Sequence, residues 1–214
     1  MTDTESRPAR RTGRPPLTDR ATLLAAAREI GFSDLTVGAV TTRVGVKYST
    51  FYRHFPSLEA LVAALVDDVV TDDVFPDVDS RWQEQLLSFA AATFDVMAAH
   101  PGLAPALVRL PDAPDAMMTA FRRLTDRLIA VGFSAEDAVL ASGTAVQMGM
   151  QPWLSASGQG VGDLRRRDQV LDSVQAFDPQ VRAVFRDRID DPPRSWTLRR
   201  VELVITGLEA RLPS

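Results

Sequence analysis

The chain has 214 residues, a formal net charge of −4 and no cysteine, so disulfides and thiolate metal sites are excluded. It has two histidines, His54 and His100, which cannot form a His-rich metal cluster, and we expect no metal and no cofactor. The N-terminus has no apolar centre and no run of about 18 apolar residues occurs, so we expect a cytoplasmic protein without a secretory signal or a membrane span.

Charge is unevenly distributed along the chain. Residues 1–55 include nine basic and five acidic residues, whereas residues 56–214 include fifteen basic and twenty-three acidic residues. Chance clustering of solvated charge would give the same count. A basic head on an acidic body nevertheless favours a polyanionic partner for the head.

The first two predicted helices belong to this basic head. No segment alternates apolar and polar residues over the length of a strand, so the pattern predicts an all-α fold. We expect Thr18 to cap a helix over residues 19–30, which Gly31 closes. Thr36 is expected to cap a second helix, and Gly45 forms the tight turn that follows it.

A third helix is predicted over residues 47–55, with Phe51 and Phe55 on its inner side. Two short helices joined by a glycine turn form the frame of a helix-turn-helix, whose second helix enters the major groove of DNA. Such a helix needs an outer face that can hydrogen-bond and carry positive charge, and a plain solvated face is the alternative. The outer residues are Lys47, Tyr48, Ser49, Thr50, Tyr52, Arg53 and His54.

The rest of the chain is predicted to form a helical bundle. Ser57 is expected to cap a helix that links this bundle to the head. Ser134 and Asp137 fit a capping box for a later helix, which Pro152 ends. Ser195 is expected to cap the last helix. The predicted helices are 57–70, 81–99, 115–131, 134–151, 164–177, 179–189 and the one that follows Ser195.

The last helix keeps a heptad-like apolar spacing that would leave a long seam exposed on a monomer. Gly143, in the 134–151 helix, would permit close approach of a neighbouring helix. We therefore expect both helices to pair with their twofold mates in a homodimer. The predicted interface residues are Leu198, Val201, Ile205, Leu208, Leu212 and Gly143.

The bundle also contains residues that could line a cavity for a small apolar or amphipathic molecule, because methionine and aromatic side chains adapt to varied ligands. Ordinary core packing is the alternative for each of them. The candidates are Trp82, Phe89, Thr93, Met117, Phe121, Gln147 and Met148. An enzyme is not expected, because the chain lacks a glycine-rich phosphate loop and a paired histidine and carboxylate motif.

Several stretches of the head resemble the N-terminal domain of the TetR family of bacterial transcription regulators. They are "LLAAAREIGFSDLTV", "TRVGV" and "STFYRHFPSLEAL". The C-terminal half is similar to the tetracycline-repressor type of domain through "WQEQL", "HPGLA", "AVGFSAEDA" and "RRVELVITGLEARL". The resemblance implies an all-α homodimer with a DNA-binding head and a ligand-binding body. Most such proteins are repressors that leave a palindromic operator when a small molecule binds.

The resemblance divides the chain into a flexible basic arm (1–16), a helix-turn-helix domain (17–56) and a ligand-binding and dimerisation domain (57–214). A DNA-binding regulator or adaptor with a filled C-terminal core and no ligand is the alternative. Gly38 and Leu58 stand where the family commonly has longer polar residues. Because His100 is the body's single histidine, we do not expect tetracycline as the ligand.

The same resemblance implies roles on the third helix. Tyr48, Ser49, Thr50 and Arg53 occupy positions that read bases or their neighbours, and arginine favours guanine. Lys47, Tyr52 and His54, again with Thr50, fit contacts to phosphate. We expect further DNA contacts from Thr36 and from Arg14, whose arm either enters the minor groove or is a solvated tail.

Overall fold

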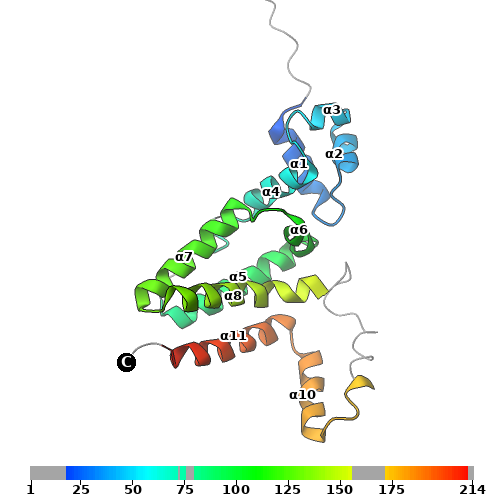
Figure 1. Cartoon of the computed structure of the whole chain (residues 1–214). Coiled ribbons are helices and arrows are strands. Elements are labelled where there is room, and N and C mark those ends of the chain that lie inside the picture. The colour runs from blue at the N-terminus through cyan, green and yellow to red at the C-terminus, as the bar shows by residue number, and fades with distance from the viewer. Residues whose placement is uncertain (1–17, 72, 76–79, 156–171, 212–214) are drawn as a thin grey trace, which may run out of the picture.

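The computed structural model describes residues 18–71, 73–75, 80–155 and 172–211 (Figure 1). Over these ranges the chain forms helices and no strands, which confirms the all-α prediction. The helices are α1 (Arg20–Ile30), α2 (Val37–Val44), α3 (Tyr48–Phe51), α4 (Leu58–Val69), α5 (Trp82–Ala99), α6 (Leu103–Arg109), α7 (Asp115–Val131), α8 (Ala135–Ser155), α10 (Pro179–Asp190) and α11 (Pro193–Glu209).

Side-chain caps start the helices of the head. Thr36 accepts a hydrogen bond from the Ala39 backbone N–H at 3.0 Å, and Ser57 caps α4 in the same way, both as predicted. The prediction for Thr18 is wrong, because the cap of α1 is Asp19, whose Oδ1 accepts from the Thr22 N–H at 2.8 Å. This hydrogen bond lowers the pKa of Asp19. A carboxylate suits the positive end of the helix better than the neighbouring hydroxyl does.

The recognition segment is anchored by its two phenylalanines. Phe51 and Phe55 are both fully buried, with ring centroids 5.9 Å apart. The α-helical part ends at Phe51, earlier than predicted, and residues 52–54 continue as a turn in which the His54 N–H donates to the Phe51 carbonyl at 2.9 Å. Pro56 has no N–H to donate to the Tyr52 carbonyl, and it disfavours the helical conformation at Phe55, so the helix cannot continue through this turn.

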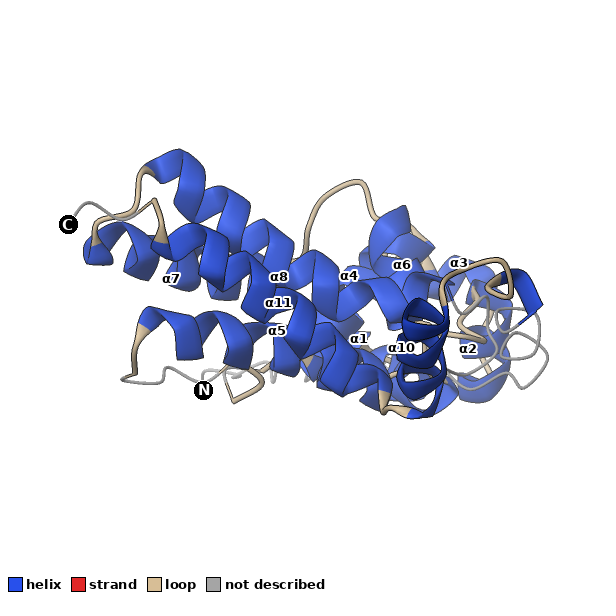
Figure 2. Ribbon diagram, turned by 90° about the horizontal axis from the view of Figure 1, so that it is seen from below, coloured by secondary structure: helices blue, strands red, loops and turns tan. Residues whose placement is uncertain are grey.

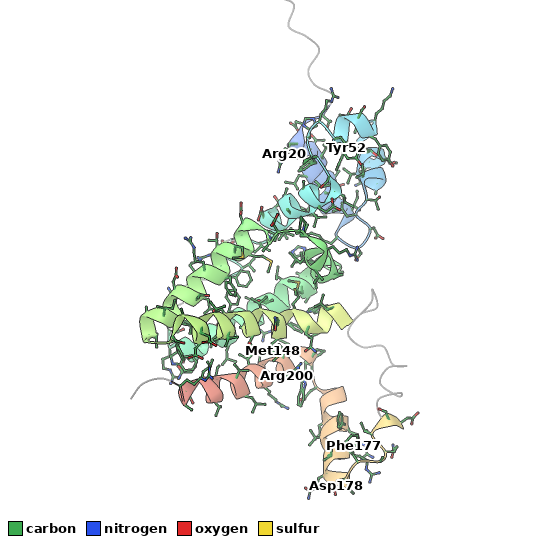
Figure 3. The ribbon with its side chains drawn as sticks, viewed as in Figure 1. Arg20, Tyr52, Met148, Phe177, Asp178 and Arg200 are labelled. Atoms are coloured by element: carbon green, nitrogen blue, oxygen red, sulfur yellow. The ribbon has the colours of Figure 1, made fainter. Side chains whose placement is uncertain are left out.

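The body is built around three helices that lie side by side. α8 packs along α5, α11 packs against both of them, and α7 packs on α8 (Figures 1 and 2). α4 extends from this bundle to the head. α10 lies off the end of α11, in the region of Phe177 and Asp178 (Figure 3).

Prolines set two boundaries differently from the prediction. α8 continues through Pro152 to Ser155, because a proline near the end of a helix disrupts little of the remaining hydrogen bonding. α11 begins at Pro193, so the start predicted for the last helix, with a cap at Ser195, is wrong. Proline is favoured in the first turn of a helix, where its missing N–H has no partner to lose. Asp178 caps α10 through the Gln180 N–H at 2.8 Å. Most of the predicted 164–177 helix lies outside the described residues.

The apolar seam of α11 faces the interior of its own chain. Val201, Ile205 and Leu208 are 2%, 7% and 7% exposed and belong to the core cluster, and Leu198 is half-buried against it. The expectation of a seam exposed on a monomer is therefore wrong, because α5 and α8 already cover it. Leu212 lies outside the described residues.

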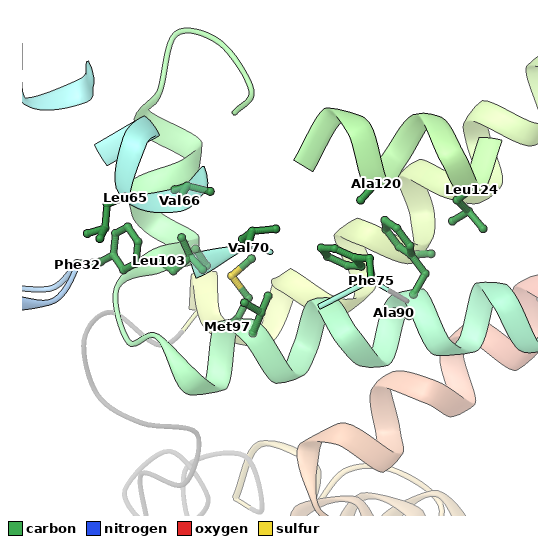
Figure 4. Packing of buried hydrophobic residues seen from close by; sticks show 14 of the residues in the cluster. Phe32, Leu65, Val66, Val70, Phe75, Ala90, Met97, Leu103, Ala120 and Leu124 are labelled. Carbon is green, nitrogen blue, oxygen red and sulfur yellow. The ribbon is translucent and has the colours of Figure 1, made fainter. Parts of the chain in front are cut away.

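The head meets the body at the corner between α5 and α6. Phe32, from the α1–α2 turn, lies near Leu65 of α4 and Leu103 of α6 (Figure 4). The Phe32 ring also contacts His100 edge-on, with centroids 6.2 Å apart. At Gly102 the approach is tighter still, because a Cβ there would lie 2.6 Å from the backbone nitrogen of Ser33.

Among the described helices, none alone has both the length and the apolar character of a membrane span. Only α5 and α6 taken together meet those two criteria, and that pair is bent by 104°.

Candidate nucleic-acid interface and effector site

The outer side of α3 and the turn after it is polar and open to solvent. Lys47, Ser49 and Arg53 are exposed, and the phenol side chains of Tyr48 and Tyr52 are 56% and 52% exposed. Fully buried Phe51 points the opposite way. The structure thus brings the predicted DNA-contacting residues together on one side of a short, anchored segment.

The remaining predicted contacts lie beside this segment. Arg53 donates to the Thr50 hydroxyl at 3.1 Å, and both Thr50 and His54 are half-buried. Thr36 is exposed at the start of α2 while its oxygen caps that helix. Arg14 lies outside the described residues.

One basic residue near the segment escaped the sequence analysis. The Arg20 guanidinium lies over the Phe55 ring, with its carbon 4.4 Å from the centroid, and Arg20 and Tyr52 project from the head (Figure 3). Stacking of arginine on an aromatic face is favourable and fixes the direction of the side chain. The spacing of 35 residues left no sequence signal for this pair.

A hollow of about 630 Å³ runs along α7 and opens to solvent. Its volume falls in the range of ligand sites, and its shape is that of an open depression lined by one helix rather than an enclosed cavity. The described side chains that line it combine apolar, hydroxyl and charged groups, and they are Asp115, Met118, Thr119, Phe121, Arg122, Thr125 and Asp126.

Most of the ligand candidates from the sequence lie elsewhere. Phe121 lines the hollow, but Trp82 is buried against Phe133, Phe89 stacks on Phe75, and the Thr93 hydroxyl donates to the Phe89 carbonyl at 2.9 Å. These three side chains are part of the packed interior.

The other three candidates lie outside the hollow as well. Met117 is half-buried on α7 and packs against the core. Met148 is half-buried where α8 passes α11, close to Arg200 (Figure 3). Gln147 is exposed on the outside of α8. Aromatic and methionine content alone did not separate core from cavity, because both environments favour the same side chains.

Comparison with known proteins identifies the fold and the head. Residues 22–65 match the sequence model of the bacterial regulatory proteins of the tetR family. The chain belongs to the TetR family. No curated protein sequence matches this regulator.

Solved structures match nearly the whole regulator. The transcriptional regulator SCO7222, a TetR from Streptomyces coelicolor, is 25% identical, with a TM-score of 0.70 over 92% of this chain and 100% of the other. Apo ActR from the same organism is 18% identical, with a TM-score of 0.74 over 92% and 97% of the two chains. TetR-Q116A from Acinetobacter baumannii in complex with minocycline is 19% identical, with a TM-score of 0.64 over 92% and 99%. The regulator is therefore a DNA-binding transcription factor rather than an enzyme, in a family whose members typically respond to ligands.

A second surface of the regulator contains Gly143, which the sequence analysis assigned to the dimer interface, together with exposed apolar residues that it did not name. On the outside of α8, Val139 and Leu140 are 50% and 55% exposed, and on the outside of α11 Leu203 is 75% exposed. Glycines accompany them on both helices, and a Cβ added at Gly143 or Gly207 would meet nothing within 4 Å. These five residues are called the outer face below.

Proposed function

We propose that the regulator is a repressor that binds a palindromic operator as a homodimer and leaves it when an amphipathic effector binds along α7. The proposal uses the domain division expected from the sequence, with a basic arm (1–16), a DNA-binding head (17–56) and a ligand-binding and dimerisation body (57–214). The main observation that supports a homodimer is the exposure of the apolar residues of the outer face.

The outer face supports a second copy as its partner for two reasons. Exposed Leu203, Val139 and Leu140 would lose water on association, which is favourable in proportion to the apolar area removed. Gly143 and Gly207 leave space for another helix to approach closely. Two identical surfaces that meet about a twofold axis form a closed interface. The two heads of such a dimer can then bind the two half-sites of a palindromic operator.

The effector would bind between apolar and polar groups of the hollow. Met118 and Phe121 offer an apolar contact, while Thr119, Arg122 and Asp126 offer hydrogen-bonding and charged groups. This combination fits an amphipathic molecule better than a wholly apolar one, since a few polar groups fix the orientation of a ligand in a mostly apolar site.

A chain of contacts leads from the hollow to the head. The backbone N–H of Ala116, next to Asp115 of the hollow, donates to Asp67 of α4 at 3.1 Å. The adjacent Asp68 accepts from Arg28 Nε of α1 at 2.7 Å. An effector that moves the first turn of α7 therefore acts on α4 and, through it, on α1. A hundredfold preference of the effector for the DNA-free arrangement corresponds to about 2.7 kcal/mol of coupling.

The dimer is tested by introducing charge into the outer face. The double variant Leu140→Arg/Leu203→Arg should sediment as a folded monomer and lose most of its affinity for the operator. Val184→Arg is the matched control, since Val184 is a 55% exposed valine on α10, away from the outer face, and it should remain dimeric. A double variant that still sediments as a dimer, or a footprint confined to one half-site, would refute the proposed assembly.

The hollow is tested by filling it. Thr119→Trp should abolish release by an effector that frees the wild-type protein from its operator, without changing operator affinity in the absence of effector. Leu154→Trp, on the exposed end of α8, is the control and should leave release intact. Full release of the Thr119→Trp variant would place the effector elsewhere.

A further inference from the structure

Gly38 lies directly beneath the Tyr48 side chain. A Cβ built on Gly38 would be 2.8 Å from Tyr48 Oη and 3.9 Å from Tyr48 Cζ. A carbon and an oxygen that are not bonded do not approach this closely without strain, so the phenol occupies the space that a side chain at position 38 would take. The absence of a side chain on α2 is what allows the first residue of α3 to lie against it.

Space, rather than backbone conformation, is what distinguishes glycine from alanine at this position. Gly38 is inside α2 and is not among the glycines with positive φ, so its backbone would accept alanine. Alanine is also the better helix former. The one feature that a methyl group at position 38 would disturb is the phenol end of Tyr48, with the Thr36 hydroxyl next at 3.8 Å.

The position of this phenol matters because Tyr48 is otherwise weakly restrained. It is 56% exposed at the start of a helix of four residues. An exposed side chain that samples several rotamers must be ordered when it binds, which costs free energy. Several rotamers can also contact different bases, which lowers the sequence specificity. Contact with the bare backbone at Gly38 limits these alternatives before DNA arrives.

We infer that Gly38 is a positioning residue that holds the Tyr48 phenol in one orientation and thereby sets which operator sequence the regulator prefers. The inference rests on the proposed contact between Tyr48 and DNA. Gly38 has no side chain with which to read a base, and it acts through Tyr48.

The test uses full-length protein and a duplex operator obtained by selection from random DNA, together with its single-base-pair variants. Affinities are measured for the wild type, Gly38→Ala, Tyr48→Phe, Tyr48→Ala and the two double variants that combine Gly38→Ala with each tyrosine change. Gly38→Ala should change the ratio of affinities between the operator and at least one of its variants by about fivefold, the lower end of what a specific base contact provides. Its melting temperature should be unchanged or higher, because the helix gains an alanine.

The tyrosine variants show whether the effect passes through the phenol. In Tyr48→Phe the nearest ring atom to an alanine Cβ is Cζ at 3.9 Å, an ordinary contact, so Gly38→Ala should have no effect on preference in that background. It should also have none in Tyr48→Ala. An equal effect of Gly38→Ala in all three backgrounds, or none in the wild type, overturns the positioning role while leaving the DNA contact in place. Unchanged preference in Tyr48→Ala overturns the DNA contact itself, and the inference with it.

Discussion

The head and the body of this regulator are held in place by different kinds of contact. In the head, caps and a glycine turn act over three or four residues, and the recognition segment is anchored by two buried rings. In the body, α5, α8 and α11 are far apart in the sequence and are positioned by close packing along their lengths. Local contacts therefore fix the surface of the head, whereas the hollow and the outer face depend on how distant segments pack.

The largest expected effect comes from removing an anchor of the head. Phe51 is fully buried, so Phe51→Ala should cost about 3–5 kcal/mol of stability. DNA binding should be lost while the body keeps its helices, and calorimetry should resolve a separate, earlier transition for the head. Leu128→Ala, at a fully buried position of α7, is the matched change in the body and should instead destabilise the main transition. A single transition that shifts as a whole in Phe51→Ala would show that the two regions unfold as one unit.

The next effect distinguishes two glycines of α8. A Cβ at Gly149 would lie 2.7 Å from the Ala90 carbonyl oxygen of α5, so Gly149→Ala should force the helices apart and cost about 1–3 kcal/mol. Gly143→Ala meets open space within its own chain, so in the monomeric Leu140→Arg/Leu203→Arg background it should raise the stability of α8 by up to about 1 kcal/mol. Urea unfolding at one protein concentration measures both changes. Equal destabilisation by the two alanines would contradict the close crossing of α5 and α8 at Gly149.

A smaller effect compares one cap in each region. Thr36→Ala and Ser134→Ala each remove a hydroxyl that accepts a backbone N–H, at 3.0 and 3.1 Å, and each should cost about 1 kcal/mol of stability. Only Thr36→Ala should weaken operator binding, because α2 belongs to the head. Loss of operator affinity in Ser134→Ala would indicate that the two regions are more tightly coupled than their separate contacts imply.

The smallest effect on stability concerns the ion pair between the regions. Arg28 and Asp68 join α1 to α4 at the surface, where solvent screens the attraction. A double-mutant cycle with Arg28→Ala and Asp68→Ala should therefore show little coupling in unfolding. The same cycle, measured as the loss of operator affinity on effector binding, should show a larger coupling. Negligible coupling energies in both measurements would show that Arg28 and Asp68 do not transmit effector binding from α4 to α1.

The difference between the two regions also decides what could be predicted from the sequence. The cap at Thr36, the turn at Gly45 and the inward phenylalanines of the recognition segment follow from local rules, and the structure confirms them. The cap at Thr18 was wrong by a single residue, because two adjacent residues can both serve as caps and only the geometry of the helix end chooses between them.

The arrangement of the body could not be predicted without knowing which helices pack against one another. Heptad spacing correctly showed that one side of α11 is apolar, but the spacing is the same whether the partner is another chain or α5 and α8 of the same chain. The outer face carries no such pattern, because Leu203 has Arg199 and Thr206 one turn away along α11. The contact between Gly38 and Tyr48 joins two helices across a turn, so no rule of helical periodicity reveals it.

The corner at Gly102 bears on how this regulator could be rebuilt. The Gly102 backbone contacts Ser33 with no side chain between them, and the side chain of any larger residue would displace the head from its position against the body. A chimera that joins this head to a foreign effector-binding body would therefore need glycine at the equivalent corner, as well as a compatible fusion point in α4. Libraries of domain grafts that keep this residue should contain a larger share of sensors that still switch than libraries that randomise it.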